Sequence, residues 1–193
     1  MNKAIDEIKL IIDDESALAA VLIPLVEVNG EPHVLFEVRS SNLPDQPGDV
    51  CLPGGMIEEG ESPEEAAIRE TSEELCIDKS QIEGISPAKI FQSPSITIFP
   101  FFARLKNYSG TFSNDEVSEV FTVPLSFFET TVPEKYMVEW NRTPDEDFPY
   151  DKIVGGRNYK WRKQQQAVLF YEYEGHVIWG NTARIIYYNL FKK

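Results

Sequence analysis

The sequence predicts an α/β (α+β) protein with a central mixed sheet covered by helices on both faces, folded as a single domain over residues 1–193. Two observations predict this class. Apolar, β-branched segments separated by turn residues indicate strands, and one amphipathic helical segment interrupts them while another ends the chain. The 193 residues contain 42% hydrophobic side chains, enough for one well-packed core, and no shift in composition divides them into two domains.

The first quarter of the chain predicts one helix followed by two paired strands. Residues 2 to about 11 read as a short amphipathic helix. Residues 17–28 and 32–38 are apolar, β-branched runs typical of strands. Asn29-Gly30-Glu31 lies between them, and Asn-Gly is a strong signal for a tight hairpin turn. We therefore expect the two strands to pair.

The second half of the chain predicts further strands and a closing helix. Strands are expected near residues 88–92, 97–105, 117–123 and 167–177, and a helix near 183–191. Tyr173-Glu174-Gly175 is a turn candidate, and Asn181 or Thr182 is expected to cap the last helix. Between residues 133 and 162, repeated Pro and Asp predict a loop, a candidate cover for the site.

The clearest local signal is a helix that begins at Ser62 and ends near Cys76. Ser62 is a good N-cap, Pro63 fits the first helical position, and Glu65 completes a capping box. At about 100° per residue, one side of this helix forms an apolar stripe that we expect to face the core. The stripe consists of Ala67, Ile68, Thr71 and Leu75.

Three glutamates on the opposite side of the same helix predict a metal site. Glu70, Glu73 and Glu74 follow the spacing i, i+3, i+4, so all three project from one face and repel one another unless a cation binds there. Glu73 and Glu74 also lie in the last turn, where the helix dipole disfavours negative charge by a few tenths to about 1 kcal/mol each. Carboxylate oxygens are ligands for divalent cations such as Mg²⁺ or Mn²⁺.

The alternative is a solvated acidic face on an acidic protein, with Arg69 paired to Glu73. An isolated Glu-x-x-Glu-Glu is usually explained in this way. Here the position at the helix C-terminus opposes it, and an Arg four residues before a Glu is the less favourable orientation for a helical ion pair. The flanking sequence decides between the two interpretations.

The segment from about residue 55 to 77 resembles the Nudix box of the Nudix hydrolases, Gly-x5-Glu-x7-Arg-Glu-U-x-Glu-Glu-x-Gly-U, where U is a bulky apolar residue. Thr71 replaces the first apolar residue of the pattern, and Cys76 replaces its last glycine, which puts the backbone at the helix exit in question. Both departures spare the acidic positions. The matching residues are Gly55, Glu61, Arg69, Glu70, Glu73, Glu74 and Ile77.

A narrower resemblance, to the coenzyme A pyrophosphatases of that superfamily, extends outside the box. Together the two resemblances cover most of the chain. Arg39, Ser40, Gly48 and Pro53-Gly54-Gly55 match the signature that precedes the box in these enzymes. Pro44 stands where a second Arg is expected, which removes a possible phosphate contact, and Leu52 stands where Phe is expected. The runs 115–125 and 178–183 also look like this group.

The resemblance implies a Nudix-type α/β/α sandwich and metal-dependent hydrolysis of a diphosphate. The expected substrate is coenzyme A or a derivative, with phosphopantetheine and adenosine 3′,5′-bisphosphate as products. Glu70 and Glu74, one helical turn apart, are the first candidates for Mg²⁺ or Mn²⁺ ligands, and Glu73 completes the set. The backbone carbonyl of Gly54 or Gly55 is a further candidate ligand, since glycine lets the backbone approach a ligand closely.

We expect other charged residues to take part in substrate binding and proton transfer. Arg69 is expected to orient Glu61 or Glu73, and Arg39 to contact a phosphate, although an Arg at a strand end is often structural. The box does not determine which residue removes a proton from water. The candidates for this general base are Glu73, Glu116 and Glu119.

Composition limits the partners. A net charge of −14 disfavours nucleic acid and anionic membranes as partners. The partner that the resemblance implies is a small nucleoside diphosphate, whose own negative charge requires metal ions at the glutamate face. The run 160–163, preceded by Arg157 and Tyr159, is a candidate phosphate and base contact, although a solvated loop is favoured. A homodimer contact is a further candidate, carried by exposed aromatics. These aromatics are Tyr136, Trp140 and Tyr150.

Two cysteines make no disulfide framework, so reduced thiols are expected. His33 and His176, the two histidines, sit in strand-like contexts and are expected to be structural. The N-terminus lacks the apolar core of a signal peptide, and no apolar run approaches the length of a membrane span, so cytoplasmic residence is the default expectation.

Two other functions stay open. Pro44 in place of Arg keeps open another substrate, namely an ADP-sugar, a dinucleotide polyphosphate or a damaged nucleoside triphosphate. A nucleotide sensor without catalysis is the alternative from another class. Three metal-competent acids argue against a sensor, because binding alone does not require them.

Overall fold

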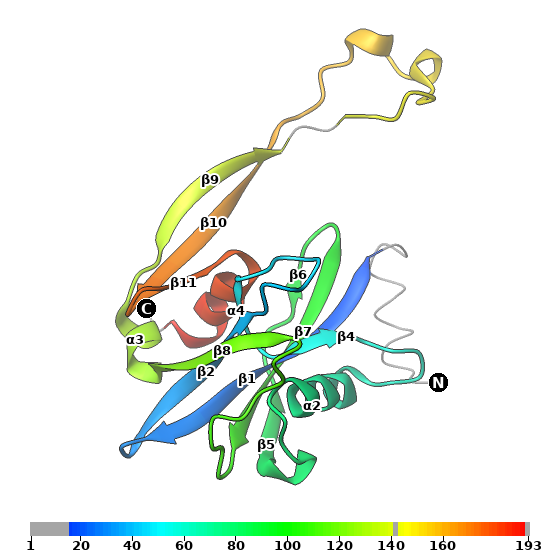
Figure 1. Ribbon diagram of the computed structural model, residues 1–193. Coiled ribbons are helices and arrows are strands. Elements are labelled where there is room, and N and C mark those ends of the chain that lie inside the picture. The colour runs from blue at the N-terminus through cyan, green and yellow to red at the C-terminus, as the bar shows by residue number, and fades with distance from the viewer. Residues whose placement is uncertain (1–15, 141–142, 192–193) are drawn as a thin grey trace.

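The computed structural model describes residues 16–140 and 143–191 (Figure 1). The helix expected at residues 2–11 lies outside the described residues. Among the described residues, no helix is both long and apolar enough to cross a membrane.

The main sheet is built around two long paired strands, β1 (Ala17–Val28) and β2 (Glu31–Arg39). Asn29 (φ 52°) and Gly30 (φ 82°) form the turn between them, both in the left-handed region that the Asn-Gly signal predicts. β7 (Ile96–Leu105) runs parallel to β1, and β8 (Val117–Pro124) runs antiparallel to β2. The expected mixed sheet is therefore confirmed.

Shorter strands extend this sheet, and a second sheet of three strands follows β8. In the main sheet these are β3 (Val50–Cys51), β4 (Gly54–Met56), β5 (Ile82–Pro87) and β6 (Phe91–Gln92). The second sheet contains β9 (Glu134–Trp140), β10 (Gln164–Tyr173) and β11 (His176–Trp179). The α-helices are α2 (Pro63–Glu74), α3 (Leu125–Thr130) and α4 (Gly180–Leu190), and 3₁₀ turns occur at Lys79–Gln81, Tyr150–Lys152 and Gly156–Asn158.

Alternate residues of β1 face two separate cores, as the twofold period of a strand requires. Ala19 and Ile23 pack with buried residues of α3 and α4, whereas Ala20 and Leu22 pack with buried residues of α2. The main sheet thus lies between α2 on one face and α3 and α4 on the other (Figure 1). This is the expected α/β/α arrangement.

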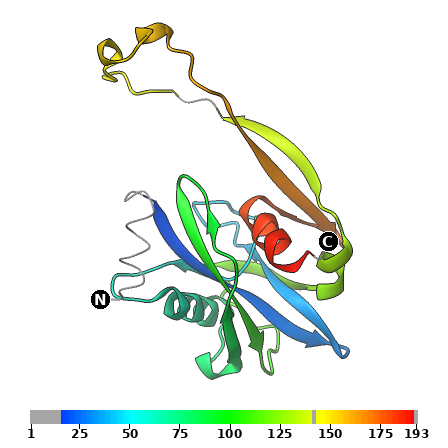
Figure 2. The same cartoon turned by 180° about the vertical axis from the view of Figure 1, so that it is seen from behind.

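The loop expected between residues 133 and 162 is wrong in part, because it begins with strand β9. All residues of β9 are exposed. Tyr136, Val138 and Trp140 alternate along it, but the Pro and Asp residues that follow favoured a loop. The expectation that this region covers the glutamate helix is also wrong. Figures 1 and 2 both show β9 and the segment beyond it extending away from α2.

Two further boundaries differ from expectation. Of the strand expected at 88–92, only Phe91–Gln92 is a strand (β6); residues 88–90 connect it to β5, which ends at Pro87. Helix α4 begins at Gly180 with Trp179 as its N-cap and no side-chain cap, so Asn181 and Thr182 do not cap it. The reason is that β11 runs directly into α4, leaving no turn residue to fill the cap position.

Candidate active site

Helix α2 begins as its sequence predicts. The backbone N–H of Glu65 donates to the Ser62 hydroxyl at 3.2 Å, and the Ser62 N–H donates to the Glu65 carboxylate at 2.8 Å. This reciprocal capping box satisfies backbone donors that the first helical turn would otherwise leave unpaired. The capping box therefore fixes where α2 begins, and with it the positions of the glutamates on the helix.

The end of α2 keeps the backbone shape that glycine usually provides. Cys76 has φ 51°, in the left-handed region, and Ile77 N–H donates to the Ser72 carbonyl at 3.0 Å. These are features of a common helix C-terminal motif in which the residue after the cap is usually Gly. The Gly-to-Cys departure therefore changes the residue but not the conformation of the exit.

The apolar stripe of α2 faces the sheet, with one important correction. Ala66, Ala67 and Thr71 are buried, whereas Ile68, which was expected in the stripe, is only half-buried. Glu74 was expected on the outer face, but its side chain turns inward and the residue is 6% exposed. The Gly54 N–H of β4 donates a hydrogen bond to Glu74 Oε2 at 2.8 Å. Helical spacing alone could not predict this, because it contains no information about a neighbouring strand.

Gly54 and Gly55 belong to strand β4, which pairs with β1, rather than to an isolated turn. A Cβ on Gly54 (φ 146°) would lie 2.3 Å from the carbonyl oxygen of Ala20, and a Cβ on Gly55 would lie 2.5 Å from the carboxyl of Glu70. Neither position has room for a side chain as the neighbouring atoms lie. The glycines therefore allow β4 to approach β1 and α2 closely.

The pairing of β4 with β1 also distinguishes the two candidate carbonyl ligands. Leu22 N–H donates to the Pro53 carbonyl at 2.9 Å, and Ile57 N–H donates to the Leu18 carbonyl at 3.0 Å. In an antiparallel ladder, alternate residues point their backbone groups at the partner strand. Gly55 therefore points toward β1, and Gly54 points its carbonyl to the side of Glu74. Gly54 is the better candidate ligand.

Arg69 joins the loop before α2 to the helix itself. Its Nε and Nη2 donate to the two carboxylate oxygens of Glu61, both at 2.9 Å, and its Nη1 donates to Glu70 Oε1 at 2.9 Å. Nη2 also donates to the Met56 carbonyl at 3.2 Å. Of the two expected partners, Glu61 is held in bidentate fashion, while Glu73 lies 3.6 Å from Nη1 and its side chain is 61% exposed. Hydrogen bonding from Arg69 lowers the pKa of Glu61.

Glu37, a buried acid on β2, is not among the residues that the sequence predicted for the site. Glu37 is 1% exposed, and its Oε1 has no hydrogen-bond partner among the described residues. Burial raises its pKa well above the usual value, and the charges of Glu74 and Glu116 add to this effect. A signal was available: Leu35 on the same strand faces the core under α2, so a period of two places Glu37 on that face as well.

Neighbouring carboxylates also raise the pKa values of Glu70 and Glu74. Burial raises the pKa of Glu74 to about 8, and the charges of Glu70 and Glu116 contribute, opposed by the Gly54 hydrogen bond. Burial also raises the pKa of Glu70. We call Glu37, Glu70, Glu74 and Glu116 the acidic cluster. The positive charges that oppose their repulsion are those of Arg39 and Arg69.

This cluster fits a divalent cation by its chemistry. Its donors are hard oxygens, and the raised pKa values of Glu37 and Glu74 show that negative charge there is unfavourable unless a cation neutralises it. Within the described part of the chain, Glu37 Oε1 has no hydrogen-bond partner. As the side chains lie, no three carboxylate, imidazole or thiolate groups within residues 16–140 and 143–191 are grouped closely enough to hold an ion. Glu70, hydrogen-bonded to Arg69, would have to share its carboxylate with the ion.

The remaining candidates divide between the two faces of the main sheet. Arg39 donates from Nε and Nη2 to the Asp45 carbonyl, both at 3.2 Å, and its charge opposes the raised pKa of Glu37 and Glu74. Glu116 belongs to the cluster, since its charge raises those pKa values. Glu119 does not: it pairs with Val38 on β2 and accepts a hydrogen bond from His176 Nε2 at 3.1 Å.

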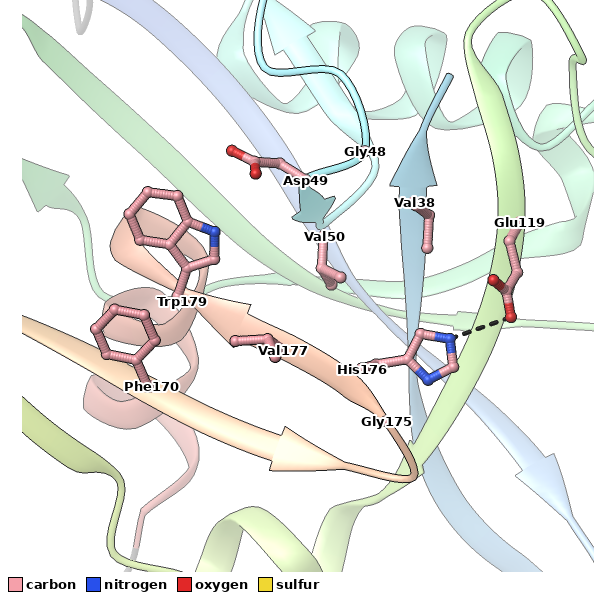
Figure 3. A pocket seen from close by; sticks show the side chains of 10 residues that line it. All are labelled: Val38, Gly48, Asp49, Val50, Glu119, Phe170, Gly175, His176, Val177 and Trp179. Carbon is pink, nitrogen blue, oxygen red and sulfur yellow. Dashed lines mark hydrogen bonds and ion pairs between the residues drawn. The ribbon is translucent and has the colours of Figure 1, made fainter. Parts of the chain in front are cut away.

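His176 and Glu119 line a separate cavity of about 540 Å³ (Figure 3). We call it the β3–β11 pocket. Val38 and Phe36 share a face of β2, and Phe36 packs with α3 and α4, so the pocket lies on the face of the sheet opposite the acidic cluster. Its walls are the Val38, Val50, Phe170, Val177 and Trp179 side chains together with Gly48, Asp49, Gly175, Glu119 and His176.

The sequence of this chain is similar to those of known Nudix proteins. The sequence profile of the NUDIX domain matches residues 17–147. A peroxisomal coenzyme A diphosphatase of Mus musculus is 35% identical over 113 residues, covering 56% of this chain and 48% of the relative. An uncharacterized Nudix hydrolase of Photorhabdus laumondii is 29% identical over 179 residues, covering 91% and 84%.

A crystal structure of a C. elegans Ap4A hydrolase superposes with a TM-score of 0.48 at 24% identity, covering 57% of this chain and 81% of that structure. The chain spans about half the length of the first curated relatives that it matches. The profile match covers more than half of this chain, including β1, β2, β4 and the whole of α2. The chain belongs to the NUDIX domain family.

Proposed function

We propose that this chain is a hydrolase that cleaves the diphosphate of coenzyme A or a derivative, with Mg²⁺ or Mn²⁺, into phosphopantetheine and adenosine 3′,5′-bisphosphate. The observation that carries the proposal is the acidic cluster: its members Glu37 and Glu74 are buried and have raised pKa values, and Glu74 accepts a hydrogen bond from Gly54 of β4. Among the described residues, Glu37 Oε1 has no hydrogen-bond partner. The similarity to a coenzyme A diphosphatase of Mus musculus supports the choice of substrate. The net charge of −14 supports a small-molecule partner rather than nucleic acid or a membrane.

Glu70, Glu74 and the Gly54 carbonyl would hold the ion, and Glu73 would complete the set. When bound, such an ion neutralises phosphate charge and lowers the pKa of a coordinated water. The chain's own residues would orient the metal-binding carboxylates and contact the phosphate. Arg69 keeps the Glu70 carboxylate directed across Gly55. Arg39, at the end of β2 beside the cluster, is the proposed phosphate contact.

Water is the nucleophile. Its oxygen bonds to one phosphorus while the bond from that phosphorus to the bridging oxygen breaks, and the bridging oxygen leaves with the other phosphate. Glu116 is the proposed general base, because its charge is felt throughout the acidic cluster. Glu73 is the second candidate, since its exposed carboxylate lies near Arg69 at the edge of the cluster.

An activity panel tests the substrate. Purified protein is incubated with Mg²⁺ or Mn²⁺ and coenzyme A, ADP-ribose or a dinucleotide polyphosphate, and the products are identified by mass. Conversion of coenzyme A into the two named products is the expected result. If coenzyme A survives while ADP-ribose is cleaved, the chemistry stands and the substrate is wrong. If nothing is cleaved but a nucleotide raises the melting temperature, the protein is a sensor.

Glu74→Gln tests the site. It keeps the hydrogen-bond acceptor for Gly54 but removes the charge, so turnover should fall at least about a hundredfold while the melting temperature is maintained or raised. Glu64→Gln is the matched control, since Glu64 is exposed on the same helix. Equal turnover in the two variants would exclude Glu74 from the metal site.

A further inference from the structure

Glu37 is a buried acid to which the proposed reaction gives no role. It lies in β2, before the segment 55–77 that carries the other acids of α2, and it is 1% exposed. The part of the chain that the structure describes offers its Oε1 no hydrogen-bond partner. A buried carboxyl group without a partner is unfavourable, and an apolar side chain at this position would avoid that cost. Glu37 therefore needs an explanation other than packing.

The strand pairing places Glu37 next to the connection that holds Glu74. Residues 51–54 lead from β3, which pairs with β2, to β4, which pairs with β1. At the start of this connection Cys51 lies opposite Glu37. At its end the Gly54 N–H donates to Glu74 Oε2 at 2.8 Å. One short connection thus contacts both acids.

The two carboxylates lie on the same side of the main sheet. Directly opposite residues of an antiparallel pair share a face, so the Cys51 side chain lies on the face of Glu37. Burial raises the pKa of the Cys51 thiol, and the charges of Glu37 and Glu74 raise it further. Leu35, two residues before Glu37, faces the core under α2. Both acids therefore lie near Cys51, one on strand β2 and the other on helix α2.

The charges around Glu37 match those of a divalent cation. Burial raises the pKa of Glu37, and the charges of Glu74 and Glu116 add to this effect. The charge of Arg39 opposes it. When ionised, these three carboxylates and one guanidinium leave two negative charges, and the remaining member of the acidic cluster is hydrogen-bonded to Arg69. Carboxylate oxygens are the ligands that divalent cations such as Mg²⁺ and Mn²⁺ prefer.

We propose that Glu37 is a further ligand of the divalent ion, supplied by β2 and acting together with Glu74 of α2. The inference rests on the proposed function, because it requires an ion at the acidic cluster. The hydrogen bond from Gly54 occupies Glu74 Oε2 and leaves Oε1 for an ion. Within residues 16–140 and 143–191 no three such groups lie close enough together, so the side chains must close on the ion when it binds. Glu37 would then be neutralised by the ion, and β2 would be linked to α2.

Binding of Mn²⁺ to the full chain tests the inference without a substrate. The electron paramagnetic resonance signal of free Mn²⁺ falls as the ion binds, so a titration gives the dissociation constant. Glu37→Gln keeps the size of the side chain but removes its charge, and should raise this constant at least about tenfold. Glu37→Asp keeps the charge on a shorter side chain and should give an intermediate constant. Glu31→Gln is the matched control, because Glu31 is exposed on the same strand, and its constant should equal that of the wild type.

Thermal melts separate a metal ligand from an acid that is merely buried. In chelator, Glu37→Gln should melt at the temperature of the wild type or higher, because a buried acid without a partner has been removed. A fixed concentration of Mn²⁺ should raise its melting temperature less than that of the wild type. If Glu37→Gln changes the melting temperature in chelator but binds Mn²⁺ as tightly as the wild type, Glu37 is structural and the inference is overturned.

Glu74→Gln in the same titration distinguishes this inference from the proposed function. Weaker Mn²⁺ binding by both Gln variants is expected. Weaker binding by Glu74→Gln alone would leave the proposed function standing and refute the role of Glu37. Should Glu37→Gln fail to fold, Glu37→Asp decides the question, since a constant equal to that of the wild type would overturn the inference. A wild type that binds no Mn²⁺ would refute both.

Discussion

The carboxylate of Glu70 lies directly over the backbone of Gly55, so the position of one metal-competent acid depends on a missing side chain. In Gly55→Ala the new Cβ would meet the Glu70 carboxyl oxygens at 2.5 and 2.9 Å. Because these atoms end a flexible side chain, Glu70 can move at little cost to stability. A displacement of about 1 Å at such a site can cost about a hundredfold in rate. We expect turnover to fall about ten- to a hundredfold with the melting temperature nearly unchanged, measured by steady-state kinetics and thermal melting; normal turnover would show that Glu70 need not lie there.

The acids were only partly predictable from the sequence. Helical spacing correctly grouped Glu70, Glu73 and Glu74 on α2, and the pattern around them indicated metal chemistry. Spacing alone could not show that β4 crosses the last turn and draws Glu74 inward through the Gly54 N–H. Glu37 was missed because a single acid in a strand is usually exposed, and its burial depends on α2, which is distant in the sequence.

At the level of elements, the exit of α2 provides a stability test. Cys76 holds φ 51° at a position where a residue with a Cβ is strained by about 1–2 kcal/mol. Cys76→Gly should relieve that strain, offset by about 0.4–1 kcal/mol from the greater entropy of the unfolded chain. We expect the free energy of unfolding in urea to exceed that of Cys76→Ala, which retains the strained backbone and serves as the control. A Gly variant less stable than the Ala variant would contradict this account.

Elements with strong local signals were predicted well, and those without were not. The capping box of α2 and the Asn-Gly turn between β1 and β2 are each determined by a few adjacent residues, and both are confirmed. Strand β9 is exposed along its whole length, and its short alternation of Tyr136, Val138 and Trp140 is followed by Pro and Asp residues that are typical of a loop. Its identity as a strand depends on pairing with β10, more than twenty residues later in the chain.

For the molecule as a whole, the acidic cluster predicts an unusual dependence of stability on pH. In the unfolded chain a glutamate titrates near pH 4.5, whereas in the folded protein Glu74 retains its proton up to about pH 8. Between these values the folded state binds more protons, so the free energy of unfolding should fall as pH rises, by up to about 1.4 kcal/mol per pH unit per proton. Burial shifts Glu37 in the same direction.

Thermal melts in chelator from pH 5 to pH 8 measure this effect. The melting temperature of the wild type should fall across that range, and that of Glu74→Gln should fall less steeply. Adding Mg²⁺ or Mn²⁺ should raise the melting temperature more at pH 8 than at pH 6, because the ligands must be deprotonated to bind. A wild-type melting temperature that rises with pH in chelator would show that the cluster is not a source of repulsion.

Arg69 connects three segments of the molecule at once: the loop before α2 through Glu61, strand β4 through the Met56 carbonyl, and the helix through Glu70. Changes to the loop at residues 57–61 are therefore transmitted to the helix through a single guanidinium. Lengthening this loop to alter substrate preference would release Glu61 and remove two of the hydrogen bonds that hold the Arg69 guanidinium beside Glu70. Substitutions meant to change substrate specificity should therefore be placed in segments that do not contact Arg69.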